Sequence, residues 1–356
     1  MLYVIRRAVG LAMLLSALFA AAASAAAPEG PRLAFVRWTT KPPKLELLSI
    51  DATGSGLRKI AGGNVGKKKA ARGAPTPFEG PTWSPDGTRI AYSGGFGKSR
   101  AVWIGAPDGS GMQVVPGLRE ATGPIFAPDG HTIAFSRTRA RQHIDIKHPE
   151  KYRSYFSTSA WTVDLETGTE RRLTPWRNGL SNEPSSFSPD GSTLAMSRAD
   201  ADGEDAVALN LIDGSTKVLA RSAEQPVYSP DGSRVAFISY RDRNQIEGFD
   251  RPVLVGELYV SNVDGSGPRR LTHTIDKQES APSWDPSGQR LAYTQSSDPE
   301  ALGLDNVIME INADGSCRKD LFDGLRKPKT LGPGLYGPVW QPGLGREAGR
   351  IDCTSR

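Results

Sequence analysis

The residues best suited to catalysis are sparse in this chain, which has four histidines and two cysteines among 356 residues. His143 and His148 are five positions apart, which does not match the i, i+4 spacing of two metal ligands on one helix face. A serine hydrolase of the α/β type needs a Gly-x-Ser-x-Gly elbow, and the chain has none. Ser110 and Ser266 lie between glycines, where serine is an ordinary turn residue. We therefore predict no catalytic residues, no metal site and no cofactor.

Basic and aromatic residues gather instead between positions 137 and 157, which makes this segment the strongest candidate for a binding site. Its basic residues outnumber its acidic ones, and Arg and Tyr are enriched where proteins contact partners. The predicted partner-binding residues are Arg137, Arg139, Arg141, His143, Lys147, His148, Tyr152, Arg153 and Tyr155, together with Lys67, Lys68, Lys69 and Trp176. They would bind a protein or an anionic envelope component, such as an acidic protein segment, a phosphorylated lipid headgroup or an anionic polymer. The alternative is a solvated loop without a specific partner.

The composition describes a globular, turn-rich protein. Hydrophobic residues make up 38% of the chain and charged residues 23%, and there are 39 glycines and 27 prolines. The apolar share is too large for a disordered chain, and so much Gly and Pro is incompatible with a helical bundle. The formal net charge of +5 is moderate, so we expect no nucleic acid partner.

The first 25 residues have the layout of a secretory signal peptide. Arg6 and Arg7 precede an apolar run from Ala8 to Ala23, and the small residues that signal peptidase requires follow at 23–25. The apolar run is short and rich in alanine, which favours cleavage over retention as a membrane anchor. We predict removal of residues 1–25 and export of residues 26–356 to the periplasm or the extracellular space, with no transmembrane segment after cleavage.

One sequence unit recurs along the rest of the chain. It consists of an aromatic residue, a small or polar residue, Pro, Asp or Ser, and Gly, followed by a short apolar strand, and its prolines are Pro85, Pro128, Pro189, Pro230 and Pro286. Pro fixes φ, Asp bonds its own backbone and Gly takes the left-handed conformation, so each copy predicts a strand–turn–strand. Each Asp then has a structural role, which disfavours calcium binding at the turns. Four short strands per unit at this spacing describe a propeller blade.

The two ends of the chain supply one further blade in two pieces. Arg32–Phe35 has the pattern of a second strand without a first, whereas Val339–Gly343 is a first strand with nothing after it. Joining them closes the ring and leaves no open sheet edge. We predict an all-β, monomeric six-bladed β-propeller of four-stranded blades, closed by a C-terminal first strand that completes the N-terminal blade. The predicted blades span about 81–122, 123–182, 183–222, 225–275, 281–325, and 338–343 with 32–63.

The repeated turn, as in Trp83-Ser84-Pro85-Asp86-Gly87, and the Ile90-Ala91-Tyr92 strand after it resemble the WD40-like repeat of the TolB-like propeller family. The resemblance covers about residues 28–343 and implies a propeller in an exported protein. Family members of the periplasmic Tol–Pal system carry an additional α/β domain before the propeller. We expect that domain to be missing here, because blade sequence begins at Arg32, so the resemblance does not imply Tol–Pal membership.

Strand order in such blades predicts two different faces. The tight turns would lie on one face, and the longer connections at 62–77, 137–157 and 240–255 would lie on the other, where loops often carry recognition. Cys317 and Cys353 would both lie on the tight-turn side. The residues between Gly343 and Cys353 can span the distance between them, and an exported protein can keep a disulfide. We predict a Cys317–Cys353 disulfide that fastens the closing strand.

These patterns together predict an exported, non-catalytic propeller that recognises a protein or an anionic cell-envelope component through its long-loop face. The alternative is a propeller enzyme, a lyase or a hydrolase, with its site in the central channel. Such an enzyme would need acids, bases or metal ligands that converge on the channel.

Overall fold

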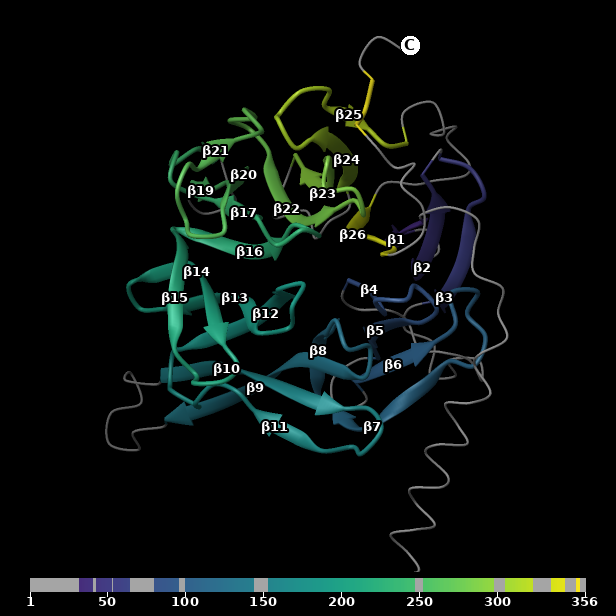
Figure 1. Ribbon diagram of the computed structural model, residues 1–356, viewed down its shortest axis with the longest axis vertical. Helices are drawn as coiled ribbons and strands as arrows, with labels where there is room; N and C mark the ends of the chain where they lie inside the picture. Colours follow the sequence, from purple (N-terminus) through teal and green to yellow (C-terminus); the bar gives the residue numbers. More distant parts are fainter. Residues whose placement is uncertain are drawn as a thin grey trace, which may run out of the picture.

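Six four-stranded antiparallel sheets surround a common centre in the computed structural model (Figure 1). The structure describes residues 32–40, 43–52, 54–64, 80–95, 100–143, 153–246, 252–297, 305–322, 334–342 and 350–352. The predicted all-β six-bladed propeller is confirmed. Outside the described residues lie the predicted signal peptide and the predicted site residues Lys67, Lys68, Lys69, Lys147, His148, Tyr152 and Cys353.

The strands of each blade follow one another in sequence, and their bounds are as follows. Blade one contains β4 (Thr82–Trp83), β5 (Ile90–Gly94), β6 (Ala101–Gly105) and β7 (Gln113–Arg119). Blade two contains β8 (Ala121–Phe126), β9 (Thr132–His143), β10 (Arg153–Asp164) and β11 (Glu170–Arg172). Blade three contains β12 (Ser181–Phe187), β13 (Thr193–Asp200), β14 (Gly203–Asn210) and β15 (Thr216–Arg221).

The remaining blades differ slightly in how they are assembled. Blade four contains β16 (Ala223–Tyr228), β17 (Arg234–Ser239), β20 (Glu257–Asn262) and β21 (Arg269–Arg270), with a separate hairpin of β18 (Gln245–Ile246) and β19 (Val253–Leu254). Blade five contains β22 (Gln278–Trp284), β23 (Arg290–Ser296), β24 (Val307–Asn312) and β25 (Lys319–Asp320). Blade six contains β26 (Leu335–Trp340), β1 (Arg32–Thr40), β2 (Pro43–Asp51) and β3 (Arg58–Asn64). The described part of the chain includes no helix with the length and apolarity to cross a membrane.

The ring closes as predicted, because β26 pairs antiparallel with β1 although the two strands come from opposite ends of the chain. Leu33 lies opposite Trp340, and Ala34 lies opposite Val339. The join also reaches blade one, where the indole Nε1 of Trp83 donates to the carbonyl O of Val339 at 3.1 Å. The pairing removes the free edge that an incomplete blade six would present.

The apolar core lies between neighbouring blades, in six clusters among the described residues. Second strands such as β9 contribute to two clusters, because successive side chains of a strand point to opposite faces of the sheet. Phe135 packs in the cluster shared with blade one, and the preceding Ala134 packs in the cluster shared with blade three. The repeated Ile-Ala-aromatic pattern is therefore explained by a sheet that is covered on both faces.

The first strand of each blade lies next to the centre, where it contacts the first strands of the neighbouring blades (Figure 1). Most of these strands contain a residue with positive φ: Gly123, Gln225, Ala281 and Gly337. In three of them the amide N–H donates to a hydroxyl of the preceding blade, as Gln225 does to Ser197 Oγ at 2.8 Å. Because a residue with positive φ interrupts the alternation of apolar and polar residues, the sequence pattern does not show where such a strand begins. In blades two to six the first strand begins two or three residues before the predicted boundary.

The repeated turns are held by their own side chains. In blade four, Ser229 Oγ donates to Asp231 Oδ1 at 2.5 Å, and the backbone N–H of Ser233 donates to the same atom at 3.1 Å. The hydrogen bond from Ser229 is the main cause that lowers the pKa of Asp231 to about 2. Each such carboxylate thus stabilises its own turn. Within the described ranges we find no group of three His, Cys, Asp or Glu suited to hold a metal ion.

Candidate functional site

The segment predicted as a long loop in blade two is a regular β-hairpin. β9 and β10 pair without interruption from Thr132 opposite Asp164 to His143 opposite Arg153. The predicted long connection at 137–157 is therefore wrong for the described part of this segment. The segment contains no Gly and no Pro before Pro149, so nothing ends the ladder where the rest of the blade ends. We call residues 137–143 and 153–159 the basic arm.

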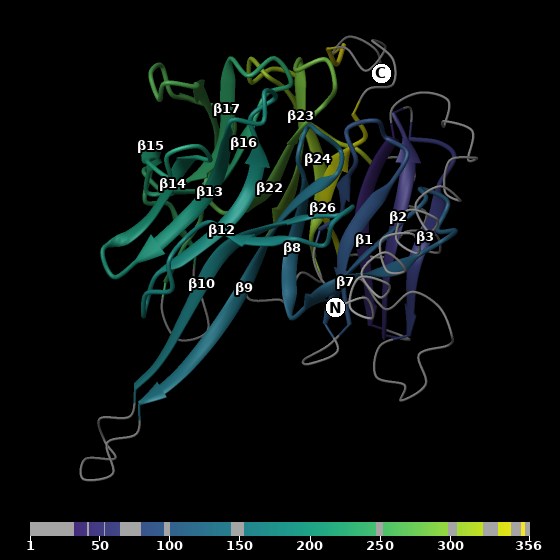
Figure 2. The same cartoon turned by 60° about the horizontal axis from the view of Figure 1, so that its bottom comes forward.

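The arm projects away from the body of the propeller on the long-loop side (Figure 2). This side, the long-loop face, carries the connections between second and third strands and those between blades. The register places Arg139 opposite Ser157, Arg141 opposite Tyr155 and His143 opposite Arg153. With Arg137 opposite Ser159, six of the predicted site positions are therefore brought together in one two-stranded ribbon.

Arg137 lies at the base of the arm and is already paired within the protein. Its guanidinium forms two hydrogen bonds with the Glu170 carboxylate, at 2.6 and 3.0 Å. The same group lies 5.1 Å from the ring centroid of Phe135 and 5.0 Å from that of Trp161. A bidentate pair stacked on aromatic rings is a strong, rigid contact. Arg137 therefore anchors the arm to the blade.

Arg139 lies two residues farther out and is exposed. Its guanidinium carbon is 4.3 Å from the ring centroid of Trp176, which is half-buried in the connection from blade two to blade three. Both residues were predicted to contact a partner, and the structure brings them into contact with each other. Among the described residues no carboxylate forms an ion pair with Arg139. Phe156, on the opposite strand, has 64% of its surface exposed.

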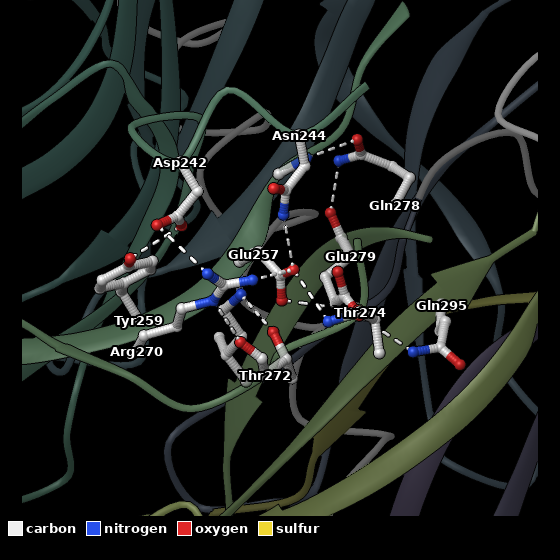
Figure 3. Close-up of polar contacts among 12 residues, drawn as sticks. Asp242, Asn244, Glu257, Tyr259, Arg270, Thr272, Thr274, Gln278, Glu279 and Gln295 are labelled. Carbon is white, nitrogen blue, oxygen red and sulfur yellow. Dashed lines mark hydrogen bonds and ion pairs between the residues drawn. The ribbon is translucent and has the colours of Figure 1, made fainter. Parts of the chain in front are cut away.

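Sequence reasoning missed a second feature of the long-loop face, a network of carboxylates between blades four and five (Figure 3). Glu257, the first residue of β20, is fully buried. Its Oε1 accepts hydrogen bonds from Arg270 Nη2 at 2.6 Å, from Asn244 Nδ2 at 2.9 Å and from the backbone N–H of Thr274 at 2.9 Å. A buried carboxylate needs such donors to offset the loss of hydration.

Arg270 is the cation around which this network is arranged (Figure 3). Besides Glu257 it pairs with Asp242 Oδ1 at 3.2 Å, and its Nε donates to the carbonyl O of Thr272 at 2.6 Å. Asp242 also accepts from the Tyr259 hydroxyl at 2.8 Å. Burial, followed by this hydrogen bond and the Asp242 charge, raises the pKa of Tyr259 to about 12. The arginine thus holds two carboxylates and a connecting loop in one arrangement.

Glu279, the second residue of β22, is also fully buried but has a different set of partners. Its Oε1 accepts from the Thr274 hydroxyl and from Gln295 Nε2, the latter at 2.9 Å, while Oε2 has no hydrogen-bond partner. Burial raises the pKa of Glu279 to about 7, and the neighbouring Glu257 charge adds to the rise. Glu279 therefore carries a proton for part of the time at neutral pH.

Three further carboxylates lie at the starts of strands in blades three and four. Glu224 accepts a hydrogen bond from the Tyr240 hydroxyl at 2.7 Å. Burial and the charges of Glu224 and Glu183 raise the pKa of Glu204 to about 7, and burial raises the pKa of Glu224 as well. The two carboxyls thus interact, since the charge of Glu224 is among the causes of the raised pKa of Glu204. The long-loop face therefore combines a basic arm on blade two with carboxylates on blades three to five.

Comparisons with known proteins support the fold. No family model matches the chain. Over 225 residues, 60% of this chain, it is 25% identical to the protein named "Uncharacterized peptidase YuxL" of Bacillus subtilis (strain 168), of which the match covers 29%. It is 27% identical over 225 residues to "Uncharacterized protein Atu1656" of Agrobacterium fabrum (strain C58 / ATCC 33970), covering 60% of this chain and 68% of that protein. The chain thus spans less than a third of the first of these relatives.

Two solved structures are similar over most of the chain. TolB from Acinetobacter baumannii superposes with a TM-score of 0.62 at 20% sequence identity, covering 88% of this chain and 67% of that one. The putative TolB from Agrobacterium tumefaciens gives a TM-score of 0.53 at 17% identity, covering 83% and 90%. The protein is a six-bladed β-propeller that is structurally similar to the propeller domain of TolB.

Proposed function

We propose that this protein is an exported, non-catalytic β-propeller that binds a protein or an anionic cell-envelope component through its long-loop face. The basic arm is the main contact. One observation carries this proposal: β9 and β10 continue as a paired ribbon beyond the body of the propeller (Figure 2). None of the core clusters among the described residues includes a residue of this ribbon, and its outer part carries Arg139, Arg141 and Arg153. Rigid elements that present Arg and aromatic side chains are well suited to recognition.

Charge on the outer arm selects the kind of partner. Glu170 already neutralises Arg137 at the base, whereas Arg139 is exposed on the ring of Trp176. A guanidinium on an aromatic face keeps its donors free for carboxylate or phosphate oxygens. The expected partner is therefore anionic, and its binding should weaken as salt increases.

A Cys317–Cys353 disulfide is part of the same proposal, since it suits an exported protein. Ile351, two residues before Cys353, is docked on blade five: its N–H donates to Asn312 Oδ1 at 2.7 Å, and its carbonyl O accepts from Asn312 Nδ2 at 3.1 Å. Arg350 pairs with Asp314 in the turn that precedes Cys317. Titration of thiols in denatured, unreduced protein tests this, with none expected and two free thiols contradicting it.

One observation favours the catalytic alternative. Burial and the neighbouring Glu224 and Glu183 charges raise the pKa of Glu204 to about 7, and a carboxyl that holds a proton near neutral pH can act as a general acid. The test is turnover of sugar-acid oligosaccharides or peptides by the mature protein. A turnover rate that falls at least about tenfold in Glu204→Gln would favour the enzyme, whereas no turnover in the unsubstituted protein favours the binding module.

Affinity capture from the envelope fraction of the protein's own host tests the binding proposal. The mature protein is compared with the double variant Arg139→Glu/Arg141→Glu. A second double variant, Arg172→Glu/Lys217→Glu, makes the same charge change at exposed positions of β11 and β15. We expect one component that the first variant loses and the second retains. Loss in both variants or in neither would contradict the role of the arm.

A further inference from the structure

The outer half of β9 has one edge that no described strand covers. β8 pairs with β9 only as far as Ala121 opposite Arg137. On the other side, β10 follows β9 all the way to His143. An uncovered strand edge presents backbone N–H and C=O groups that can pair with an added strand. From Thr138 to His143 the side of β9 away from β10 is such an edge.

Hydrogen bonds near the base of the arm show which residues of β9 face this edge. The carbonyl O of His131 accepts from Leu165 N at 2.8 Å, on the β10 side. The carbonyl O of Thr132, just after it, accepts from Ala127 N at 2.8 Å, on the β8 side. Along a strand the direction of these groups alternates from residue to residue. Even-numbered residues of β9 therefore direct their N–H and C=O groups away from β10.

The hydrogen bonds of β10 lead to the same assignment. Thr158 N donates to Leu180 O at 3.1 Å, and Ala160 O accepts from Leu173 N at 2.8 Å, both on the side away from β9. Odd-numbered residues of β10 thus face β9, and the register pairs them with odd-numbered residues of β9. On the outer arm, Thr138, Ala140 and Gln142 are left with backbone groups that face the free edge.

The charge beside this edge determines what can bind there. Positions 139 and 141 of β9 are both arginine, two residues and roughly 7 Å apart along the strand. An added strand would place every second side chain beside these positions. A second copy of the arm would bring arginine against arginine, which is unfavourable. A segment with acidic residues at alternate positions would pair with them.

We propose that the free edge of β9, from Thr138 to His143, binds an extended partner segment with acidic residues at alternate positions as an added β-strand. This rests on the proposed function of the arm and names the partner that the arm recognises. Backbone hydrogen bonds from Thr138, Ala140 and Gln142 provide affinity, and the two arginines select the charge pattern.

Two synthetic peptides of equal composition test the charge pattern. One alternates Glu and Thr over ten residues, and the other has five Glu followed by five Thr. Binding of both to the mature protein is measured by fluorescence polarisation at low salt. We expect the alternating peptide to bind at least about tenfold more tightly than the peptide with five Glu followed by five Thr. A tenfold change in the dissociation constant corresponds to the contribution of about one hydrogen bond.

A proline substitution tests the backbone contact. The N–H of Ala140 faces the free edge, so Ala140→Pro removes one donor to the added strand and leaves the ladder with β10 intact. Ala140→Thr, which keeps the N–H, is the matched control. We expect a loss of about tenfold in affinity for the alternating peptide in Ala140→Pro only. In the unsubstituted protein, that peptide should slow amide hydrogen exchange at Thr138, Ala140 and Gln142.

The outcomes separate this inference from the proposed function. Equal affinity for the two peptides, with both lost in Arg139→Glu/Arg141→Glu, would overturn the added strand and leave an anionic partner for the arm standing. Unchanged exchange at the three amides, or no binding of either peptide, would also overturn the added strand. Affinity capture from the envelope fraction tests independently of these peptides whether the basic arm binds a partner.

Discussion

The guanidinium carbon of Arg139 lies 4.3 Å from the ring centroid of Trp176, which joins the basic arm to the connection between blades two and three. Arg137 makes a similar contact with Trp161 one step closer to the ring, at 5.0 Å. The arm is therefore fastened at two successive arginines and not only through its backbone ladder. A binding element held in this way loses little conformational freedom when a partner binds.

The Arg139–Trp176 contact should be measurable in a double-mutant cycle. We expect Arg139→Ala, Trp176→Leu and the double variant to give a coupling free energy of about 0.5–1 kcal/mol, as for other cation–π pairs near a surface. Urea unfolding of the four proteins provides the values. Strict additivity of the two single substitutions would show that the contact does not stabilise the arm.

Ring closure should depend on Gly87, in the turn of blade one. Its carbonyl O accepts from Gln341 Nε2 at 2.7 Å, and a Cβ atom there would lie 2.9 Å from that nitrogen. Gly130 has a similar positive φ, but its nearest atoms are 3.9 Å away. Gly87→Ala and Gly130→Ala both incur the backbone cost of the left-handed region. Only the former also disturbs the closing contact, and it should lower the free energy of unfolding by about 1 kcal/mol more. Equal effects would argue against this contact.

Arg270 should be among the least tolerant positions on the long-loop face. Arg270→Met leaves the buried Glu257 without its cation, and we expect a loss of about 3–5 kcal/mol in the free energy of unfolding. Arg221→Met is the matched control, because Arg221 pairs with Asp205 at 3.0 Å with 79% of its side chain exposed. That substitution should cost less than about 1 kcal/mol. A loss of less than about 1 kcal/mol in Arg270→Met would contradict this role of the ion pair.

Stability should fall as the pH rises from about 5 to 7, and Glu279 should contribute to this fall. Burial raises its pKa from 4.5 to about 7. Between these values the folded state binds more protons than the unfolded state, so the free energy of unfolding decreases with increasing pH. The full shift corresponds to about 3 kcal/mol at most. Glu279→Gln should remove this part of the slope and unfold less readily than the unsubstituted protein at pH 8.

Urea unfolding of both proteins at several pH values between 5 and 8 measures the two slopes. Glu204, whose pKa is also about 7, contributes equally to both curves, so the difference between them isolates Glu279. Identical slopes would contradict a proton on Glu279. If Glu279→Gln is less stable than the unsubstituted protein at every pH, the folded state requires the carboxylate form of Glu279.

The fold could be predicted because each blade repeats the same local requirement. Pro, Asp and Gly have separate roles in one turn, and five copies of that turn leave few alternatives. The arm could not be predicted as a strand, because a stretch rich in arginine without hydrophobic alternation resembles a charged loop in the sequence. The carboxylates at Glu257 and Glu279 carried no signal either, since their partners come from separate strands and connections of two blades.

Site-specific photo-crosslinking in the intact host tests the role of the arm most directly. A photoreactive amino acid replaces Phe156, which is 64% exposed on the arm, or Ile212, which is 86% exposed in the tight turn between β14 and β15. We expect a discrete crosslinked product from position 156 that disappears in Arg139→Glu/Arg141→Glu, and none from position 212. No product from position 156, or the same product from both positions, would contradict recognition through the basic arm.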